Sequence, residues 1–449
     1  MLSFPSAARG LFMSSCVAFS EPTFRRMACL ALGAILASGR HTVTAMLTNA
    51  RCVISGHWSC YHRVFSRASW SLWPLGKILA RAVLRWIPDD EPVVVAIDDT
   101  TAQHRGKRVY GKGCHHDAVR SAHKQIVFKW GHRWVVLAVM VKFPFACRHW
   151  ALPVLVALYR PEELDRKEKR QHKTPPRLAG QLIAVLIRWF PSRRFVFLGD
   201  GGYASHKLAA FCQKHARQAT LVSRFHKNAN LYGPPPVRRP GANGRPRTKG
   251  RKLASPEKVV ARNRLRKATV EWTSGTHRRV GLVSGTGHWY KAGQGLIEVR
   301  WVFVRDLQGR HRDEYFYATD VSLTAEEVVG YYTRRWSIET TFQEMREHLG
   351  FETTRQWTAK SVLRTGPWLL GLFSAVCLIF AEHARTHKVK IGQRPWYHKT
   401  EPTFSDALAT VRELIWSETL LKQSPGNTGV KKLPPVLREM LLHHLAAAA

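Results

Sequence analysis

Two short apolar runs that each lead into aspartate constrain the fold of this chain more than any other feature. Residues 93–97 read Val-Val-Val-Ala-Ile and precede Asp98 and Asp99, and residues 195–199 read Phe-Val-Phe-Leu-Gly and precede Asp200. Runs of this length and composition predict buried strands. Because helical patterns lie between the strand-like runs, we expect an α/β core whose strand ends carry carboxylates.

The charge of the chain predicts a polyanionic partner. The sequence holds 70 Lys and Arg residues against 31 Asp and Glu, a formal net charge of +39. A surplus of this size is typical of proteins that bind nucleic acid, so we expect double-stranded DNA and no small-molecule substrate. The alternative is a ribosome-associated or membrane-surface protein. Such proteins are usually shorter or carry their charge in tails, whereas here it runs through the whole chain.

The cysteines and the longest apolar stretch indicate a cytoplasmic protein. None of the eight cysteines forms a Cys-x-x-Cys pair, which argues against a zinc ribbon or a thioredoxin-like site. Free thiols are typical of a reducing compartment. Residues 368–381 are apolar but shorter than the ~20 residues that a membrane span needs. We therefore expect a buried core helix there and no membrane association.

Residues 1–88 are expected to form an all-helical N-terminal DNA-binding domain. One helical pattern ends at Ser38 and Gly39, and Thr42 is placed to cap a second, short helix. Helix, tight turn and helix is the shape of a helix-turn-helix DNA reader, which places Arg40 and Thr42 near DNA. Any helical hairpin gives the same pattern.

The rest of the chain divides at changes of pattern. Residues 89–225 are expected to form the first part of a catalytic core, with a polar loop over residues 100–117. Residues 226–322 read as a β-rich insertion, residues 323–385 as the C-terminal helical part of the core, and residues 386–449 as a C-terminal helical region.

Residues 233–267 within the insertion hold twelve Lys and Arg against a single acid, Glu257. A segment this basic and poor in apolar residues predicts a mobile loop, either a solvated linker or a DNA contact. We favour the DNA contact because the loop lies between candidate carboxylates in sequence. The side chains expected to reach DNA are Arg245, Arg247, Lys249, Arg251 and Lys252.

A late helical run places polar side chains at fixed spacings. Tyr332, Arg335, Glu339 and Arg346 lie along one stripe of a helix because they are three, four and seven residues apart. A solvated salt-bridged face would explain Arg335 and Glu339, but not the aligned Tyr332 and second arginine. Arginine forks bind phosphate oxygens, so we expect DNA contact from Tyr332, Arg335 and Arg346. Trp336 is either a core residue or a platform for a displaced base.

The three carboxylates predict a divalent metal site. Asp99, Asp200 and Glu339 could hold two metal ions beside a phosphodiester, and Mg²⁺ suits an all-oxygen site. Asp98 and Asp99 face opposite sides of a strand, so only one of them can join the cluster. An aspartate at a strand end can instead cap a helix or a turn, which is the alternative for each aspartate taken singly.

With these residues in view, the chain resembles the DDE transposases of bacterial insertion sequences. It is most similar to the cut-and-paste branch with the signature Tyr, two residues, Arg, three residues, Glu, six residues, Lys. Tyr332, Arg335 and Glu339 match this spacing, and Arg346 replaces the lysine and keeps its charge. In the family the first catalytic aspartate precedes threonine, and this resemblance selects Asp99.

The resemblance implies an RNase H-like catalytic core with a β-rich insertion. It implies binding to terminal inverted repeats and target DNA, a homodimer in the synaptic complex, and two Mg²⁺ ions, for which Mn²⁺ can substitute. It further implies strand cleavage and strand transfer in the bacterial cytoplasm, in association with the nucleoid. Trp336 would lie near a distorted transposon end.

Two other functions fit the same residues. One is an RNase H-like, structure-specific DNA nuclease that does not integrate DNA, although compact nucleases of this kind are shorter. The other is an inactive transposase-derived DNA-binding protein, although all three candidate carboxylates are present.

Overall fold

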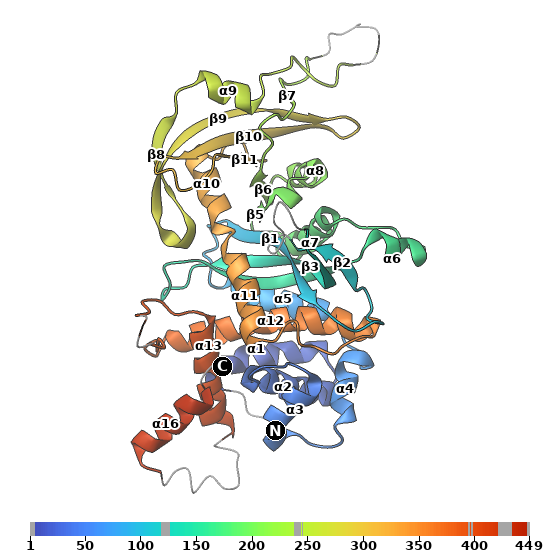
Figure 1. The fold of residues 1–449 in the computed structure, drawn as a ribbon, viewed down its shortest axis with the longest axis vertical. Coiled ribbons are helices and arrows are strands. Elements are labelled where there is room, and N and C mark those ends of the chain that lie inside the picture. The colour runs from blue at the N-terminus through green and yellow to red at the C-terminus, as the bar shows by residue number, and fades with distance from the viewer. Residues whose placement is uncertain are drawn as a thin grey trace.

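The computed structural model describes residues 5–117, 126–237, 244, 246–393, 396, 398–420 and 433–446. One mixed sheet runs through the middle of the molecule, with a β-rich extension at one end and helices packed at the other (Figure 1). The mixed α/β class expected from the sequence is confirmed.

The central part of the sheet has the strand order β4-β3-β1-β5-β6. The first three strands pair antiparallel, and β1, β5 and β6 pair parallel. This order and these directions are consistent with an RNase H-like core. The strands are β1 Val93–Gln103, β3 Phe128–Val141, β4 Trp150–Tyr159, β5 Phe195–Gly199 and β6 Ala219–Arg224.

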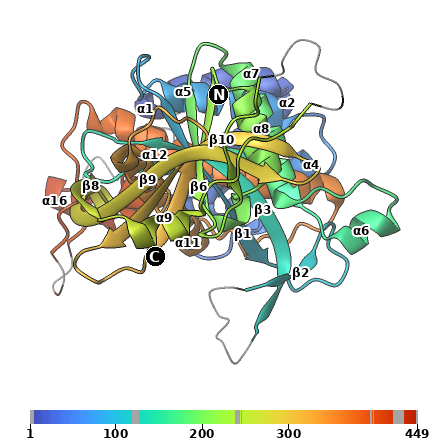
Figure 2. The same cartoon turned by 90° about the horizontal axis from the view of Figure 1, so that it is seen from above.

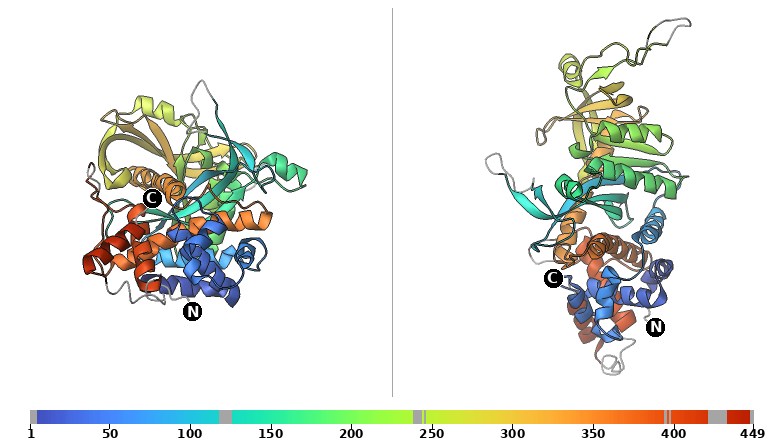
Figure 3. Two further views of the ribbon diagram at one scale, coloured as in Figure 1. Left: turned by 60° about the horizontal axis from the view of Figure 1, so that its bottom comes forward. Right: turned by 90° about the vertical axis from the view of Figure 1, so that its right-hand side faces the viewer.

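Helices cover both faces of this sheet. The crossover connections of the parallel strands require helices, which are α7 Pro175–Trp189 and α8 His206–Lys214. The opposite face is crossed by α10 Ala325–Arg334 and α11 Ser337–His348 (Figures 2 and 3). Because β1 is buried between the two layers, its apolar residues form the centre of the core.

The insertion continues the core sheet instead of forming a separate one. β11 pairs antiparallel with β6 through Ala318 and Val222, and the remaining insertion strands follow outward from it. These strands are β7 Leu231–Tyr232, β8 Arg266–Glu271, β9 His277–Lys291, β10 Gly295–Asp306 and β11 Glu314–Ala318. The predicted β-rich character of this region is therefore present.

Two predicted loops contain regular structure. The sequence predicts a polar loop over residues 100–117, but β1 continues to Gln103 and β2 Gly113–His116 pairs with β3. The described part of the basic segment 233–267 includes helix α9 Pro256–Arg262. Pairing partners distant in sequence supply hydrogen bonds that a local pattern does not reveal.

The helices at the two ends of the chain pack against each other. Arg364 donates to the carbonyl of Trp70 at 2.6 Å, and Arg412 donates to the carbonyls of Ile35 and Ala37 at 2.7 and 2.8 Å. Through these bonds, buried arginines from the C-terminal part of the chain satisfy backbone carbonyls at helix ends and in loops of the N-terminal region. Residues 1–88 therefore do not stand apart from the rest of the molecule.

Further helices and short turns surround the core layers. At the N-terminus the helices are α1 Ser6–Ser15, α2 Glu21–Leu36, α3 Val43–Asn49, α4 Ser59–Ser66 and α5 Leu72–Leu84. Elsewhere they are α6 Glu162–Lys167, α12 Ala359–Ala384, α13 Phe404–Leu414 and α16 Pro435–Ala446. Short helical turns are η1 Cys16–Ala18, η2 Arg51–Val53, η3 Gly201–Tyr203, η4 Thr273–Gly275 and the π-type η5 Ile415–Leu420.

Helix α12 is long and apolar enough to cross a membrane by length and composition alone. Within the fold, however, 67% of its most apolar stretch is buried. It contacts β4, α5 and α13 on several sides. This agrees with the core helix expected around residues 368–381.

The helical hairpin predicted near the N-terminus is present as α2 and α3. The two helices approach so closely that a Cβ on Gly33 would lie 2.0 Å from the carbonyl oxygen of Met46. Thr42 caps α3, accepting a hydrogen bond from the amide of Ala45 at 3.1 Å, and Arg40 is exposed. That this hairpin reads DNA stays a prediction.

Gly33→Ala should destabilise the protein because the new methyl group would overlap backbone atoms that cannot move aside independently. We expect the free energy of unfolding to fall by about 1–3 kcal/mol, measured by urea denaturation. Gly10→Ala in α1 is the matched control, since nothing lies within 4 Å of its added Cβ. Equal stability of the two variants would contradict the close packing of α2 on α3.

Candidate active site

Strand β1 sends its two adjacent aspartates to opposite faces of the sheet. Asp98 faces α11, and its Oδ2 accepts a hydrogen bond from Nη1 of Arg335 at 2.6 Å. Asp99 accepts two hydrogen bonds from Arg133, at 2.5 and 2.9 Å, and one from the hydroxyl of Tyr203 at 3.1 Å. The alternation of side chains along the strand causes this division.

Arg335 joins the first strand to the late helix. Its Nη2 donates to Oε1 of Glu339 at 2.9 Å while Nη1 holds Asp98. The side chain of Arg335 is only 9% exposed, against 15% for Asp98 and 38% for Glu339. A single buried guanidinium thus brings together two carboxylates that are distant in sequence.

Asp200 lies beside Asp98 at the neighbouring strand end. The parallel register pairs Ile97 with Gly199, so the next residue of each strand is an aspartate. The side chain of Asp200 accepts from the amide of Gly202 at 2.8 Å, and its carbonyl accepts from Ser223 at 2.9 Å. It therefore caps a turn, as the alternative interpretation allowed, and also borders the other carboxylates.

Burial and charge set the protonation of Asp98. Burial raises the pKa of its carboxyl to about 7, the positive charge of Arg335 opposes this rise, and the negative charges of Asp200 and Asp99 add to it. Burial by itself would lower the pKa of Arg335, but the charges of Asp98 and other neighbours raise it. Carboxylates that raise one another's pKa favour a cation between them.

The signature residues do not lie on one continuous helix. The chain turns more tightly at Arg335 and Trp336, where amides bond carbonyls three residues back, and α11 begins at Ser337. Trp336 is 59% exposed at this junction, so its interpretation as a core residue is wrong. The break turns the tryptophan to solvent while Arg335 stays buried.

Tyr332 is buried at the end of α10. Its ring stacks on Phe316 with centroids 4.1 Å apart and faces the cations of Arg335 and Arg224 at 5.8 and 5.9 Å. Burial raises the pKa of its hydroxyl. The positive charges of Arg335 and Arg224 oppose this rise, and the negative charge of Asp200 adds to it. Among the described residues this buried hydroxyl has no hydrogen-bond partner.

Arg346 fastens α11 to β1 instead of pointing to solvent. Its Nη2 donates to the hydroxyl of Thr100, and its Nε lies 3.6 Å from Glu352. Glu352 also forms an ion pair with Lys129 at 2.6 Å. Arg346 therefore contacts β1 at Thr100, the residue directly after the two aspartates.

The other predicted DNA-contacting residues lie away from the carboxylates. Arg40 and Thr42 belong to the helical end of the molecule, and the basic loop belongs to the opposite end (Figure 1). Arg245 lies outside the described residues, whereas Arg247, Arg251 and Lys252 are exposed. Lys249 packs over the rings of Tyr232 and Tyr290, 4.6 and 4.1 Å from their centroids.

The chemistry of the carboxylate group fits a hard divalent cation, because Asp98, Asp200 and Glu339 offer only oxygen ligands. Within the described residues, however, the ligand atoms of these three side chains do not all lie within 4.8 Å of one another. Those of Glu344, Glu347 and His348 on α11 do. His348 pairs with Glu344 at 3.2 Å, so an ordinary ion pair accounts for that set.

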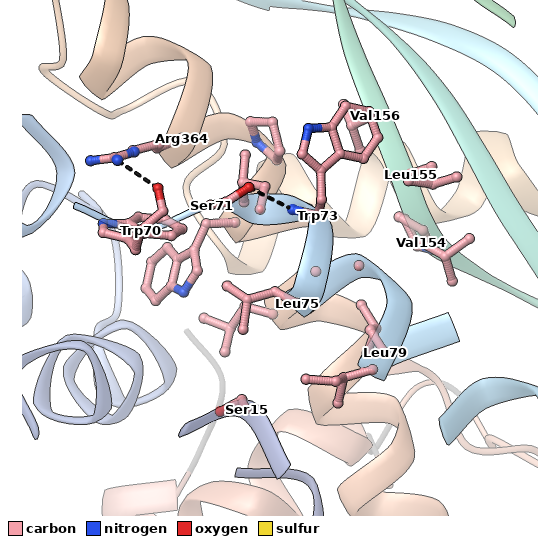
Figure 4. A pocket seen from close by; sticks show the side chains of 18 of the residues that line it. Ser15, Trp70, Ser71, Trp73, Leu75, Leu79, Val154, Leu155, Val156 and Arg364 are labelled. Carbon is pink, nitrogen blue, oxygen red and sulfur yellow. Dashed lines mark hydrogen bonds between the residues drawn. The ribbon is translucent and has the colours of Figure 1, made fainter. Parts of the chain in front are cut away.

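An apolar cavity of about 790 Å³ lies apart from the carboxylates, between α1, α5, α12, α7 and β4 (Figure 4). Its lining is mainly aliphatic and aromatic, with the guanidinium of Arg364 bonded to the carbonyl of Trp70 at one side. No carboxylate among the described residues lines it, so this lining does not suit metal-dependent phosphodiester chemistry.

Comparison with known proteins identifies the family. A family model described as DDE superfamily endonuclease matches residues 16–279, more than half of the chain. The protein belongs to the DDE superfamily of endonucleases. The matched region of this DDE endonuclease contains Asp98, Asp99 and Asp200 and ends before Glu339.

Among solved structures, a cryo-EM structure of the piggyBac transposase synaptic complex with hairpin DNA is similar. Its TM-score is 0.41 at 10% sequence identity, over 98% of this chain and 80% of that chain. No curated protein matches the sequence.

Sequence reasoning missed three features of this DDE endonuclease site. It selected Asp99 and did not anticipate that Arg335 would bond Asp98 and Glu339 together; which aspartate binds metal stays a prediction. It gave no role to Arg133 or Tyr203, which hold Asp99. The available signal was the tyrosine three residues after Asp200, but its partner across the sheet could not be deduced from spacing alone.

Arg335→Ala should destabilise the protein in metal-free buffer because it leaves Asp98 buried beside Asp200 without its cation. We expect a loss of about 3–5 kcal/mol in the free energy of unfolding, measured by guanidinium denaturation. The double variant Asp98→Asn/Arg335→Ala should lose less, since the buried charge is then also removed.

Arg334→Ala is the control, because Arg334 pairs with Glu271 at 2.6 Å in a more exposed position. Its cost should be about 0.2–1 kcal/mol. If Arg334→Ala and Arg335→Ala cost the same, Arg335 does not hold a buried charge pair.

Proposed function

We propose that this DDE superfamily endonuclease is the DNA transposase of a bacterial insertion sequence. It would bind the terminal inverted repeats, cleave the strands at the element ends and join them to target DNA. The observation that carries the proposal is the bridging of Asp98 and Glu339 by Arg335, with Asp200 at the next strand end.

We propose that Asp98, Asp200 and Glu339 hold two Mg²⁺ ions, for which Mn²⁺ could substitute. Asp99, the residue selected by the sequence, is the alternative first ligand. Bound ions would supply Lewis acidity to the attacking and leaving oxygens of the phosphodiester. Asp98 is favoured because Arg335 joins it to Glu339, whereas Asp99 faces Arg133 and Tyr203 on the other side of the strand.

The surrounding side chains are assigned to the DNA backbone and to a displaced base. We assign the guanidinium of Arg335 and the hydroxyl of Tyr332, both buried in the protein alone, to phosphate oxygens of the bound DNA. Trp336 is exposed at the junction of α10 and α11, where an indole can stack on an unpaired base. Arg346 would act by holding α11 against β1.

DNA outside the active site is assigned to both ends of the molecule. Arg40 and Thr42 would contact a terminal repeat. The hydroxyl oxygen of Thr42 already accepts a hydrogen bond from the amide of Ala45, which leaves its O–H as the group for DNA. The basic side chains of the insertion, Arg245, Arg247, Lys249, Arg251 and Lys252, would contact the flanking backbone. A homodimer would hold two element ends together, in the bacterial cytoplasm.

Two alternatives compete with this proposal. One is cleavage of branched DNA without joining, and the other is DNA binding by an inactive derivative. A strand-transfer assay with element-end DNA and Mg²⁺ separates the three functions. Joined products support a transposase, cleavage alone supports a nuclease, and binding alone supports the inactive derivative.

The same assay tests the ligand assignment with three variants, of which Asp98→Asn and Asp99→Asn form a matched pair. Asp98→Asn and Glu339→Gln should abolish nicking at the element boundary, because each removes a proposed metal ligand. Asp99→Asn should lose only the roughly 10–100-fold expected of a supporting residue. The reverse order for the two aspartates would return the role to Asp99, and full activity of Glu339→Gln would reject Glu339 as a ligand.

DNA affinity should depend steeply on salt, since the net charge of +39 favours phosphate contacts. If 6–10 phosphates are contacted, affinity should fall by about 10³–10⁵ between 50 and 200 mM salt. Fluorescence anisotropy with a labelled element-end duplex measures this slope. An affinity that is flat over this range would contradict the assignment of the basic surface to DNA.

A further inference from the structure

A second cleft opens beyond the C-terminal end of β1. It has a volume of about 980 Å³ and is lined mainly by residues from 103–112, by residues 127–130 at the start of β3 and by residues 357–358. Gln103 lies five residues after Asp98 on β1, so at about 3.3 Å per residue the cleft begins roughly 17 Å from that aspartate. The β2–β3 pair projects from the body of the molecule on this side (Figure 2).

The charge of the cleft is positive. Arg105, Lys107 and Arg108 line it and are exposed, and no acidic side chain pairs with any of them in the described part of the chain. Two acids, Asp117 and Glu168, also line the cleft, and Glu168 is neutralised by Arg160 at 2.8 Å. Unpaired cations in a row suit an extended polyanion.

Large aromatic side chains stand beside these cations. Trp130 is 54% exposed, Trp357 63% and Phe128 60%, and all three line the cleft. The ammonium of Lys112 lies 5.4 Å from the ring centroid of Trp130. Exposed indoles that cluster in a concave site mark a binding surface, because they would otherwise be buried.

The backbone holds these aromatic residues in place. The amide of Tyr110 donates to the carbonyl of Trp357 at 2.9 Å, and the amide of His104 donates to the carbonyl of Trp130 at 3.0 Å. Trp130 also pairs with Cys114 across β2 and β3. The cleft is therefore a formed platform built from three separate segments of the chain.

We propose that this cleft binds the unpaired bases of a single-stranded DNA segment adjoining the end held at the carboxylates. Trp130 and Trp357 would stack on bases while Arg105, Lys107 and Arg108 contact phosphates. A duplex hides the faces of its bases, so it could use the cations but not the indoles. The position next to a DNA end rests on the proposed function, whereas preference for unpaired bases does not.

The test measures binding without metal, so that it is independent of cleavage. Fluorescence anisotropy compares a blunt duplex with the same duplex carrying an unpaired thymidine tail. The unaltered protein should bind the tailed duplex more tightly. Trp130→Ala and Trp357→Ala should each weaken tailed-duplex binding by about 5- to 100-fold, the range for losing a base–aromatic stack, and leave blunt-duplex binding unchanged.

Trp396→Ala is the matched control, because Trp396 is 82% exposed and does not line the cleft. It should leave binding of both DNAs unchanged, and Trp130→Phe should recover part of the tail preference. Thermal unfolding verifies that each variant is folded. The proposal is overturned if the unaltered protein shows no tail preference, or if the tryptophan variants lose affinity equally for both DNAs.

A separate cleavage assay on blunt element-end DNA with Mg²⁺ distinguishes the two failures. Loss of tail preference with cleavage intact rejects the cleft alone. Tail preference without cleavage rejects the proposed transposase activity and leaves the cleft as a single-strand binding site.

Discussion

The buried guanidinium of Arg335 is the interaction on which the rest of the site depends. It is the group that touches both β1 and α11 at the carboxylates, through Asp98 and Glu339. Removing a charge of this kind from water is costly unless it is fully paired. The helical layer of residues 325–348 is therefore held to the sheet by a polar contact at the proposed metal ligands. Arg335 thus takes part both in the packing of the helices on the sheet and in the proposed active site.

The division of labour between Asp98 and Asp99 follows from the pleat of the strand. One aspartate faces the helix that carries Glu339, and the other faces Arg133 and Tyr203. Tyr203 follows Asp200 in the turn η3, so the second aspartate of the pair is tied to the segment that presents Asp200. Of the two adjacent carboxylates, Asp98 thus contacts the residue that binds Glu339, and Asp99 contacts the turn that follows Asp200.

Much of this arrangement could be predicted from sequence, and the failures have physical causes. β5 has the predicted bounds, because four consecutive apolar residues between an arginine and a glycine allow little else. The break at Trp336 was missed because both residues at the junction keep helical dihedral angles and only the hydrogen bonding changes. The choice between Asp98 and Asp99 depends on which face α11 covers. The face that α11 covers is a feature of the tertiary structure, which the spacing of residues within β1 does not reveal.

The pairing of β11 with β6 has a mechanical consequence. Ser223 of β6 lies opposite Tyr317 of β11, and its hydroxyl holds the carbonyl of Asp200. A load applied to the insertion is therefore carried by continuous hydrogen-bonded strands to the residue that supports Asp200. The insertion is therefore joined to the strand end that carries Asp200 through paired strands, so a displacement of β11 would be transmitted to that strand end.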